Sequence, residues 1–405
     1  MSLRPPAGFI RPGYDPLKNP NAPTGVSATA GDASASVAFT APANVGGSAI
    51  SAYYAVSNPD QITGTGASSP VSVTGLTNGT SYTFSVWALN SYGPSGYSGA
   101  SGSVTPSFQR ALFAGAGDLS GSYVNTIQYV SIVSTGNALD FGDLVGSTPF
   151  GAAGNASSTR GLVAPGSTSN TIVYVTLATT GNATDFGDMT IGRGILGACA
   201  TETRLTFGAG KGLGANDPTN VIDYVTIASA GNATDFGDLT IARYCRAAFQ
   251  STTRGVYCGG NFNFDPYVTN VIDYITIAST GNAVDFGDVT LPTDSTYLTG
   301  CSSTTRGILG SNNNGENVIS YVTIASGGNT NDFGDLTVAR RQAASASGKT
   351  RALFAGGNVG GATASNVIDY ITIASTGNAT DFGDMIDSPY TSFGCGFSSA
   401  HGGLA

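Results

Sequence analysis

The chain has 405 residues, of which only 10% are charged and 58 are Gly. Few charges and abundant Gly are typical of many short strands joined by tight turns, and they exclude long surface helices and coiled coils. The 16 Lys and Arg residues against 25 Asp and Glu give a net charge of -9, so no basic stripe is available to neutralise a phosphate backbone and nucleic acid is not an expected partner.

Apolar segments and cysteines further restrict the class of protein. No stretch approaches the roughly 18 apolar residues of a membrane span, and the first ten residues hold no apolar signal-peptide segment. We therefore expect neither membrane insertion nor export by a signal peptide. The five cysteines form an odd set without a Cys-x-x-Cys pair, which predicts reduced core residues and synthesis in a reducing cytosol: Cys199, Cys245, Cys258, Cys301 and Cys395.

Residues 1–20 are predicted to form an extended, Pro-rich N-terminal arm. Its five prolines disfavour helices and sheet ladders and favour a polyproline-like backbone. The segment is either an unstructured terminus or an anchor that docks on another subunit. Apolar side chains, which disordered tails usually lack, favour the anchor. The anchoring residues would be Phe9, Ile10, Tyr14 and Leu17.

Residues 21–107 alternate apolar and polar residues over several short segments, which is typical of a β-sandwich of fewer than 100 residues. The stretch from Leu76 to Gly93 resembles the fibronectin type III family around its tyrosine corner, with Tyr82 as the corner residue and Leu76 as its packing partner. Phe39 stands where that family usually has a tryptophan. The resemblance implies a spacer or adhesion module and not an enzyme.

Residues 108–405 contain an internal repeat. The motif Asp-Phe-Gly-Asp occurs six times at intervals of 45 to 50 residues, beginning at Asp140, Asp185, Asp235, Asp285, Asp332 and Asp381. Each copy follows a Gly-Asn pair and a Tyr-containing strand, and an Arg-led strand lies further upstream. With a short strand of small residues between copies, each repeat supplies four strands.

Four strands in 45 to 50 residues is the size of a propeller blade. The strand order resembles kelch repeats, with Phe in place of the usual tryptophan. The predicted fold class is therefore all-β: an Ig-like fibronectin III sandwich at 21–107 and a six-bladed kelch-like β-propeller at 108–405, after the arm at 1–20. A strand between Phe393 and Ser399 is expected to complete the first blade and close the propeller.

The repeated Asp-Phe-Gly-Asp is predicted to be a structural turn. A kinase has one such motif beside a catalytic loop, whereas this chain has six at regular spacing. We expect Asn and Asp side chains to cap the turn, Gly to take a positive φ and Phe to pack between blades. A repeated calcium site is the alternative. No metal or other cofactor is predicted.

Residues for catalysis are scarce. The single histidine, His401, is expected on the surface. The chain therefore lacks the histidines that a Ser-His-Asp triad or a His-rich metal site would need, and we predict that it is not an enzyme. The repeated arginines are expected to pair with acidic turns; a ring of substrate-binding arginines is the alternative. They are Arg110, Arg160, Arg204, Arg254, Arg306 and Arg351.

Two loops that differ between repeats, 211–219 and 261–269, are the candidate binding sites. Their aromatic residues either pack within the loop or form a contact patch for a sugar or a protein. The candidate binding residues are Lys211, Asp217, Phe262, Phe264 and Tyr267.

Two functions are compatible with this organisation. A low-charge Ser/Thr/Gly-rich chain with a Pro-rich arm resembles structural proteins of tailed phages, especially those of marine and cyanobacterial hosts. The first hypothesis is a non-enzymatic virion protein (tail fibre, neck or baseplate appendage, or capsid decoration), assembled in the host cytoplasm and exposed after lysis. Its arm would bind other virion proteins, and its propeller a host-surface glycan or protein. The alternative is a carbohydrate-active propeller enzyme with an accessory fibronectin module.

Overall fold

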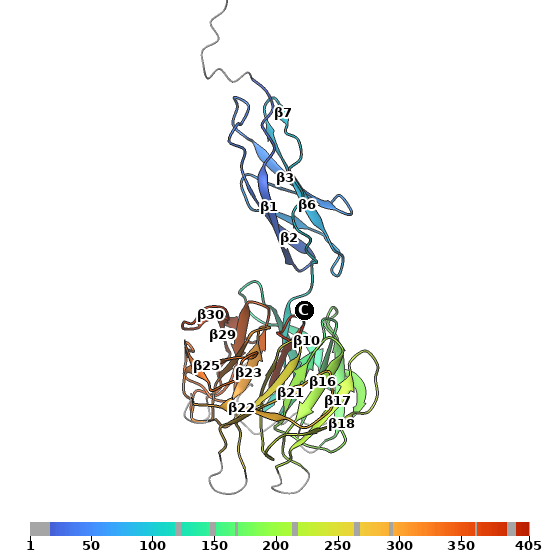
Figure 1. The fold of residues 1–405 in the computed structure, drawn as a ribbon, viewed down its shortest axis with the longest axis vertical. Coiled ribbons are helices and arrows are strands. Elements are labelled where there is room, and N and C mark those ends of the chain that lie inside the picture. Colours follow the sequence, from blue (N-terminus) through green and yellow to red (C-terminus); the bar gives the residue numbers. More distant parts are fainter. Residues whose placement is uncertain are drawn as a thin grey trace, which may run out of the picture. The chain divides into compact units, whose positions relative to one another are not determined.

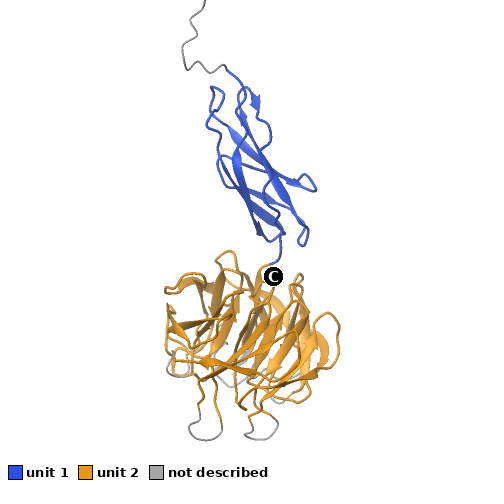
Figure 2. Ribbon diagram, viewed as in Figure 1, with its two compact units in different colours: residues 1–108 blue, residues 109–405 orange. Residues whose placement is uncertain are grey.

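The computed structural model describes residues 17–117, 123–145, 151–166, 169–212, 218–262, 268–290, 295–360, 363–386 and 394–404. The chain divides into two compact units, residues 1–108 and 109–405 (Figure 2). All regular structure in these ranges is β-strand (Figure 1). A helix long and apolar enough to cross a membrane is not found in the part of the chain that the structure describes.

Unit 1 is a sandwich of two antiparallel sheets. One sheet contains β1 (Thr24–Gly31), β2 (Ser34–Thr40) and β5 (Val71–Thr74); the other contains β4 (Thr63–Gly66), β3 (Ala52–Asn58), β6 (Thr83–Asn90) and β7 (Gly93–Pro94). Alternate residues of β2, β3, β5 and β6 are buried between the sheets. The expected alternation of apolar and polar residues therefore forms one core.

The expected tyrosine corner is present in unit 1. Tyr82 is fully buried, and its hydroxyl accepts the backbone N–H of Thr77 and donates to Asp60. Leu76 lies in the same hydrophobic cluster. Phe39 is 8% exposed and its ring centroid lies 4.8 Å from that of Tyr53, so it fills a core position.

The segment 95–104 borders β6 with a three-residue period. Three serines donate their backbone N–H to a β6 carbonyl and accept, through the side-chain hydroxyl, the N–H of the same β6 residue. The pairs are Ser95 with Ala88, Ser98 with Val86, and Ser101 with Phe84. Each hydroxyl also donates to the carbonyl of the glycine that follows it. Side chains thus supply part of the pairing that backbone carbonyls supply in a regular ladder.

Unit 2 contains six four-stranded antiparallel sheets, numbered here in chain order (Figure 1). We call their strands inner, second, third and outer. Sheet 1 is β31 (Cys395–Ser398), β8 (Arg110–Gly117), β9 (Tyr123–Ser131) and β10 (Leu139–Asp143), and sheet 2 is β11 (Ala153–Ala156), β12 (Arg160–Ala164), β13 (Thr171–Thr176) and β14 (Thr184–Asp188). Sheet 3 is β15 (Gly197–Ala200), β16 (Arg204–Gly208), β17 (Val221–Thr226) and β18 (Thr234–Asp238), and sheet 4 is β19 (Ala247–Gln250), β20 (Arg254–Cys258), β21 (Val271–Thr276) and β22 (Val284–Asp288). Sheet 5 is β23 (Thr299–Ser302), β24 (Arg306–Gly310), β25 (Val318–Thr323) and β26 (Asn331–Asp335), and sheet 6 is β27 (Ala344–Ser347), β28 (Arg351–Ala355), β29 (Val367–Thr372) and β30 (Thr380–Asp384).

The fold class expected from the sequence is corrected. The strands form eight separate sheets of three or four strands, two in unit 1 and six in unit 2, and no closed kelch-like propeller is assigned. The repeat spacing predicts the strands of one sheet, because chain neighbours pair locally. It does not fix whether successive sheets join into one closed propeller. Unit 2 is therefore described by its six sheets and by the contacts between them.

Consecutive sheets of unit 2 pack face against face. The inner strands contact one another in the order β31, β11, β15, β19, β23, β27, and β27 contacts β31. The hydrophobic clusters take residues from two sheets each; one contains Phe113 and Val130 of sheet 1 with Leu353 and Ile368 of sheet 6. The core of unit 2 thus lies between sheets and not within them.

The C-terminal strand is the inner strand of sheet 1. β31 pairs antiparallel with β8, with Phe397 opposite Leu112 and Ser398 opposite Ala111. The ring of Phe397 lies against Gly154 and Gly161 of sheet 2, where a Cβ atom would clash with it. Residues from both ends of unit 2 therefore build sheet 1. Phe393, the first residue of the expected strand, lies outside the described residues.

The Asp-Phe-Gly-Asp motif forms the outer strand of each sheet. Phe236 is buried and its ring meets that of Tyr224 edge-on at 5.9 Å. Gly237 has φ +142°, and a Cβ there would lie 2.6 Å from the backbone of Gly281 in the next sheet, so only glycine fits. The expected capping by Asp is corrected: Asp235 is exposed, and Asn282 caps instead by accepting the N–H of Asp238 at 3.1 Å.

The same cap occurs at every sheet boundary of unit 2. An Asn side chain of one sheet accepts the N–H of the last motif Asp in the preceding sheet, at 3.0 to 3.1 Å. The set includes Asn137 of sheet 1, which accepts the N–H of Asp384 of sheet 6. The Gly-Asn pair before each motif is therefore a contact between sheets.

Among the described residues, tyrosine rings and backbone carbonyls, not the expected acidic turns, are the partners given for the repeated arginines. Each guanidinium lies over a tyrosine ring of its own sheet at 4.4 to 4.9 Å, as Arg204 does over Tyr224. Each also donates to a backbone carbonyl of a neighbouring sheet, as Arg204 does to Ile277 at 2.9 Å. A planar guanidinium can stack on a ring while its N–H groups donate to a carbonyl, which explains why Arg occupies this position.

Candidate functional site

The two ends of unit 2 differ in the regularity of their connections. At one end, three residues join each inner strand to the second strand in sheets 2 to 6 (157–159 in sheet 2), and seven join the third to the outer strand in all six sheets (177–183 in sheet 2). At the other end, the second-to-third connections range from five residues (118–122) to twelve (209–220 and 259–270), and the connections between sheets also vary. We call these the constant end and the variable end.

The candidate binding residues belong to connections at the variable end. Lys211 forms backbone bridges with Gly194 and Pro218, and Asn261, next to Phe262, forms the same bridges with Tyr244 and Val268. The base of each loop is thus fixed to the segment that leads into its own sheet. The Lys211 and Phe262 side chains are half-buried.

Other candidate residues lie outside the described residues: Asp217, Phe264 and Tyr267 in the loops, and Phe9, Ile10 and Tyr14 in the arm. The remaining anchoring candidate, Leu17, is described and is 59% exposed.

Three buried ion pairs involve the third strands of sheets 3, 4 and 6, the sheets with long second-to-third connections. Arg193 contacts Asp223 at 2.9 Å, Arg243 contacts Asp273 at 2.8 Å and Arg340 contacts Asp369 at 2.8 Å, with every side chain fully buried. A threonine hydroxyl also donates to each carboxylate, from Thr190, Thr240 and Thr337. Burial lowers the pKa of Arg193 and Arg340, and the facing carboxylate opposes that shift.

These ion pairs were not predicted from the sequence, although the repeats contain a signal for them. The third strand reads Val-Ile-Asp-Tyr in sheets 3, 4 and 6, and in each case a Thr-x-x-Arg segment lies about 30 residues upstream. Sheets 1, 2 and 5 have Gln128, Val173 and Ser320 in place of the aspartate, and the segments before sheets 2 and 5 contain no arginine. The joint presence of Arg and Asp in the same repeats predicts a contact.

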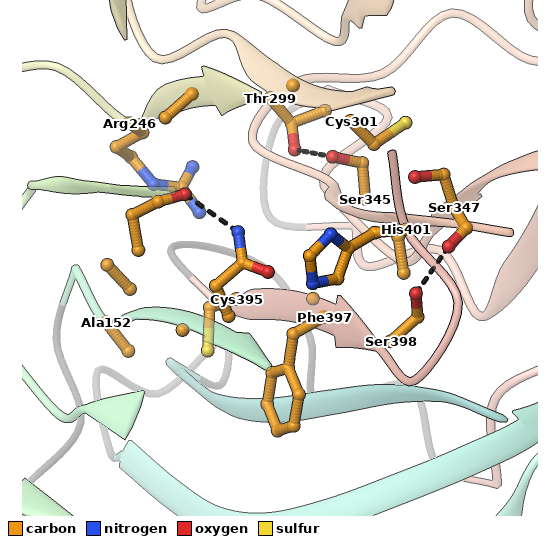
Figure 3. Close-up of a pocket in the computed structure, with 18 of the residues that line it drawn as sticks. Ala152, Arg246, Thr299, Cys301, Ser345, Ser347, Cys395, Phe397, Ser398 and His401 are labelled. Carbon is orange, nitrogen blue, oxygen red and sulfur yellow. Dashed lines mark hydrogen bonds between the residues drawn. The ribbon is translucent and has the colours of Figure 1, made fainter. Parts of the chain in front are cut away.

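A small cavity lies between the inner strands, with a volume of about 50 Å³ (Figure 3). Every sheet contributes to its lining, including Asn155 of sheet 2, Gln250 of sheet 4, Thr299 of sheet 5 and Ser345 of sheet 6. The Thr299 and Ser345 hydroxyls are hydrogen-bonded at 2.5 Å, and Asn155 donates to Gln250 at 3.0 Å. The lining is polar, and its only charged side chain among the described residues is Arg246.

The C-terminal tail lies at the constant end of this cavity. Contrary to the surface position expected for it, His401 is 3% exposed. Its Nδ1 lies 2.8 Å from Gln250 Nε2, and its Nε2 lies 2.5 Å from the Ala156 carbonyl. Burial lowers the pKa of His401 from 6.5 to about 4, so the imidazole is neutral at pH 7.

The groups that nucleophilic catalysis would use are held in structural positions. All five cysteines are free and buried, and burial raises the pKa of Cys199, Cys301 and Cys395 to about 12. A buried thiol of this kind is a poor nucleophile at neutral pH. Within the described ranges, no three His, Cys, Asp or Glu side chains lie together as a metal site requires.

Comparison with known proteins identifies the first unit. Residues 21–102 match the family model of the fibronectin type III domain, which confirms the resemblance seen in the sequence. A crystal structure of titin domains is similar at 28% identity with a TM-score of 0.21, and the match covers 22% of this chain and 32% of the titin chain. This chain therefore spans about a third of that solved chain. No curated protein matches it.

Proposed function

We propose that this protein is a non-enzymatic structural component of a tailed-phage virion that displays its six-sheet unit for contact with a host-surface glycan or protein. The observation that carries the proposal is the difference between the two ends of unit 2. Connections at one end have constant lengths, whereas those at the other end vary. A rigid scaffold with variable loops on one face is the usual arrangement of a recognition surface.

The path of the chain also supports recognition at the variable end of unit 2. The chain enters unit 2 at Gln109 and begins β8 with Arg110, at the constant end. β31 ends opposite Ala111, and the tail after it also lies at that end. The first strand of unit 2 therefore begins at the constant end, where the described part of the tail also lies, and the variable connections lie at the opposite end of the sheets.

The chemistry of the conspicuous residues supports a role without catalysis. The repeated arginines stack on tyrosines and bind carbonyls, while three of the aspartates form buried ion pairs. His401 is buried against backbone and amide groups. Their contacts account for these residues as parts of the scaffold.

The roles of the other parts follow from this proposal. The fibronectin type III domain is the spacer, and the arm at residues 1–20 is the segment that binds other virion proteins. The protein is assembled into the virion in the host cytoplasm and is exposed on it after lysis. The proposal covers a tail fibre, a neck or baseplate appendage and a capsid decoration alike.

The proposal is tested on phage particles from a host that produces the chain. Antibodies against unit 1 should label intact particles in the electron microscope, and the chain should sediment with them. A chain that begins at residue 21 should be equally stable but absent from the particles, because it lacks the anchoring segment.

Two results would contradict the proposal. One is the absence of the full chain from purified particles although it is present in the lysate. The other is hydrolysis of a polysaccharide by the purified full chain, which would favour a carbohydrate-active enzyme with an accessory fibronectin domain.

A further inference from the structure

We propose that Asn314, in the second-to-third connection of sheet 5, is a site of spontaneous deamidation, through which the variable end of unit 2 gains a negative charge with time. The inference does not depend on the virion assignment. It is carried by a comparison of two Asn-Gly pairs in the chain, one held by short hydrogen bonds and one exposed.

Deamidation of asparagine is an intramolecular reaction. The backbone nitrogen of the following residue attacks the side-chain carbonyl carbon and forms a C–N bond, and the side-chain nitrogen leaves as ammonia with the proton that the backbone amide gives up. Water then opens the cyclic imide at either carbonyl and yields aspartate or isoaspartate. The reaction therefore needs a side-chain amide that can turn, a small following residue and a backbone nitrogen that is not held in a strong hydrogen bond.

The chain contains two Asn-Gly pairs, Asn78-Gly79 in unit 1 and Asn314-Gly315 in unit 2. Their glycines are alike: φ is +83° at Gly79 and +73° at Gly315, and a Cβ atom built on either would meet no atom within 4 Å beyond its chain neighbours. Steric access to the attacking nitrogen therefore does not distinguish the two pairs.

Hydrogen bonds hold the first pair in place. Asn78 Oδ1 accepts the N–H of Ala33 at 2.8 Å, and Asn78 Nδ2 donates to Asp32 at 2.8 Å. The N–H of Gly79 donates to the Pro106 carbonyl, also at 2.8 Å. Attack at Asn78 would have to break these three bonds, so the folded chain protects this residue.

The second pair is held much less firmly. Asn314 is exposed, and within the ranges that the structure describes its side chain has no hydrogen-bond partner. The N–H of Gly315 donates to the Asn312 carbonyl at 3.4 Å, which is longer than the roughly 2.7–3.2 Å of an ordinary N–H···O bond. Both the amide that is attacked and the nitrogen that attacks it are therefore available at Asn314.

Deamidation changes the charge of this connection. Residues 311–317 contain a single charged side chain, Glu316. A carboxylate at position 314 adds a second negative charge close to it in the chain, and isoaspartate also lengthens the main chain by a methylene. The variable end of a newly made molecule thus differs from that of an aged one.

The test follows the purified full chain during incubation in mildly alkaline buffer, where a backbone amide loses its proton more readily. Peptide mass spectrometry after digestion at low pH should show deamidation at Asn314 at least about tenfold faster than at Asn78, because attack at Asn78 must first break three hydrogen bonds. An acidic form should accumulate on ion-exchange chromatography at the rate of the Asn314 reaction, and an isoaspartyl methyltransferase should methylate it.

Unfolding in guanidinium chloride separates the fold from the local sequence. Both Asn-Gly pairs should then deamidate at similar rates, because Asn78 has lost its hydrogen bonds. Asn314→Gln should remove the acidic form, whereas Asn313→Gln, which keeps Asn314-Gly315, should retain it. The proposal is overturned if Asn314 of the folded chain deamidates no faster than Asn78, or if the ratio of the two rates is the same in the unfolded chain.

Discussion

Asp273 shows how the structure assigns different roles to aspartates that look alike in the sequence. It is fully buried against Arg243 at 2.8 Å and accepts the Thr240 hydroxyl. Asp235, on the outer strand β18, is exposed. The two residues have the same side chain, but only the buried one balances a charge that water cannot reach.

We expect Asp273→Asn to lower the free energy of unfolding by about 3–5 kcal/mol, because it leaves the Arg243 guanidinium buried without its counter-charge. Asp235→Asn removes the same charge from an exposed position and should change stability by less than about 0.5 kcal/mol. Urea unfolding of both variants measures the difference. Equal effects would show that the buried pair contributes no special stability.

The Asn caps give a second prediction at this scale. Asn282→Ala should cost about 1 kcal/mol, because the N–H of Asp238 loses the side-chain oxygen that accepts it. Asp235→Ala, which removes no such acceptor, is the matched control. Chemical denaturation compares them, and a larger loss for Asp235→Ala would restore the aspartate as the capping residue.

His401 predicts a pH dependence. Its folded-state pKa of about 4 lies below its ordinary 6.5, so the unfolded chain binds more protons between these values. The stability from the neutral imidazole is complete above pH 6.5 and is lost as the pH falls to 4, by about 3 kcal/mol.

His401→Gln isolates this effect because glutamine does not titrate in that range. The wild-type thermal midpoint should fall more steeply than that of the variant between pH 6.5 and 4. Parallel curves would show that the imidazole is accessible to protons in the folded chain.

At the scale of elements, β31 shows how one short strand supports two sheets. It pairs with β8 of sheet 1, and Phe397 lies against Gly154 and Gly161 of sheet 2. Without it, an edge of β8 would be exposed together with the apolar cluster around Leu112. Exposed strand edges promote association.

We therefore expect deletion of residues 388–405 to lower the thermal midpoint of unit 2 and to cause aggregation. Phe397→Ala, which keeps the strand, should cost about 3–5 kcal/mol by removing a buried ring. Calorimetry and light scattering measure both. A truncated chain with the wild-type midpoint would show that β31 does not support sheets 1 and 2.

The elements also show what the sequence could and could not predict. Period-two alternation in residues 21–107 predicts the sandwich, and the six Asp-Phe-Gly-Asp copies mark the outer strands. The closed kelch-like propeller was wrong, because repeat spacing describes local pairing and not the arrangement of successive sheets. The cavity could not be predicted, since the tail and the six inner strands that line it are far apart in the chain.

At the scale of the whole molecule, each unit has a core of its own. The sandwich cluster contains residues of unit 1 only, among them Val37, Tyr82 and Phe84. The other clusters contain residues of unit 2 only. Separate cores are the condition for independent folding.

Residues 1–108 and 109–405 should therefore fold when produced separately. Calorimetry of the full chain should show two transitions, each within about 2 °C of the midpoint of the corresponding unit alone. A single transition in the full chain, or failure of either unit to fold alone, would contradict this independence.

The segment 95–104, which borders β6, bears on whether a second copy of the chain could add a strand to unit 1. A strand from a second copy could extend a sheet only if it met donors and acceptors repeating every two residues. Segment 95–104 bonds to β6 at every third residue, through Ser95, Ser98 and Ser101. The carbonyls of Gly96, Gly99 and Gly102 are already occupied by the serine hydroxyls. The mismatch of period at this border of unit 1 therefore disfavours the addition of a strand from a second copy there.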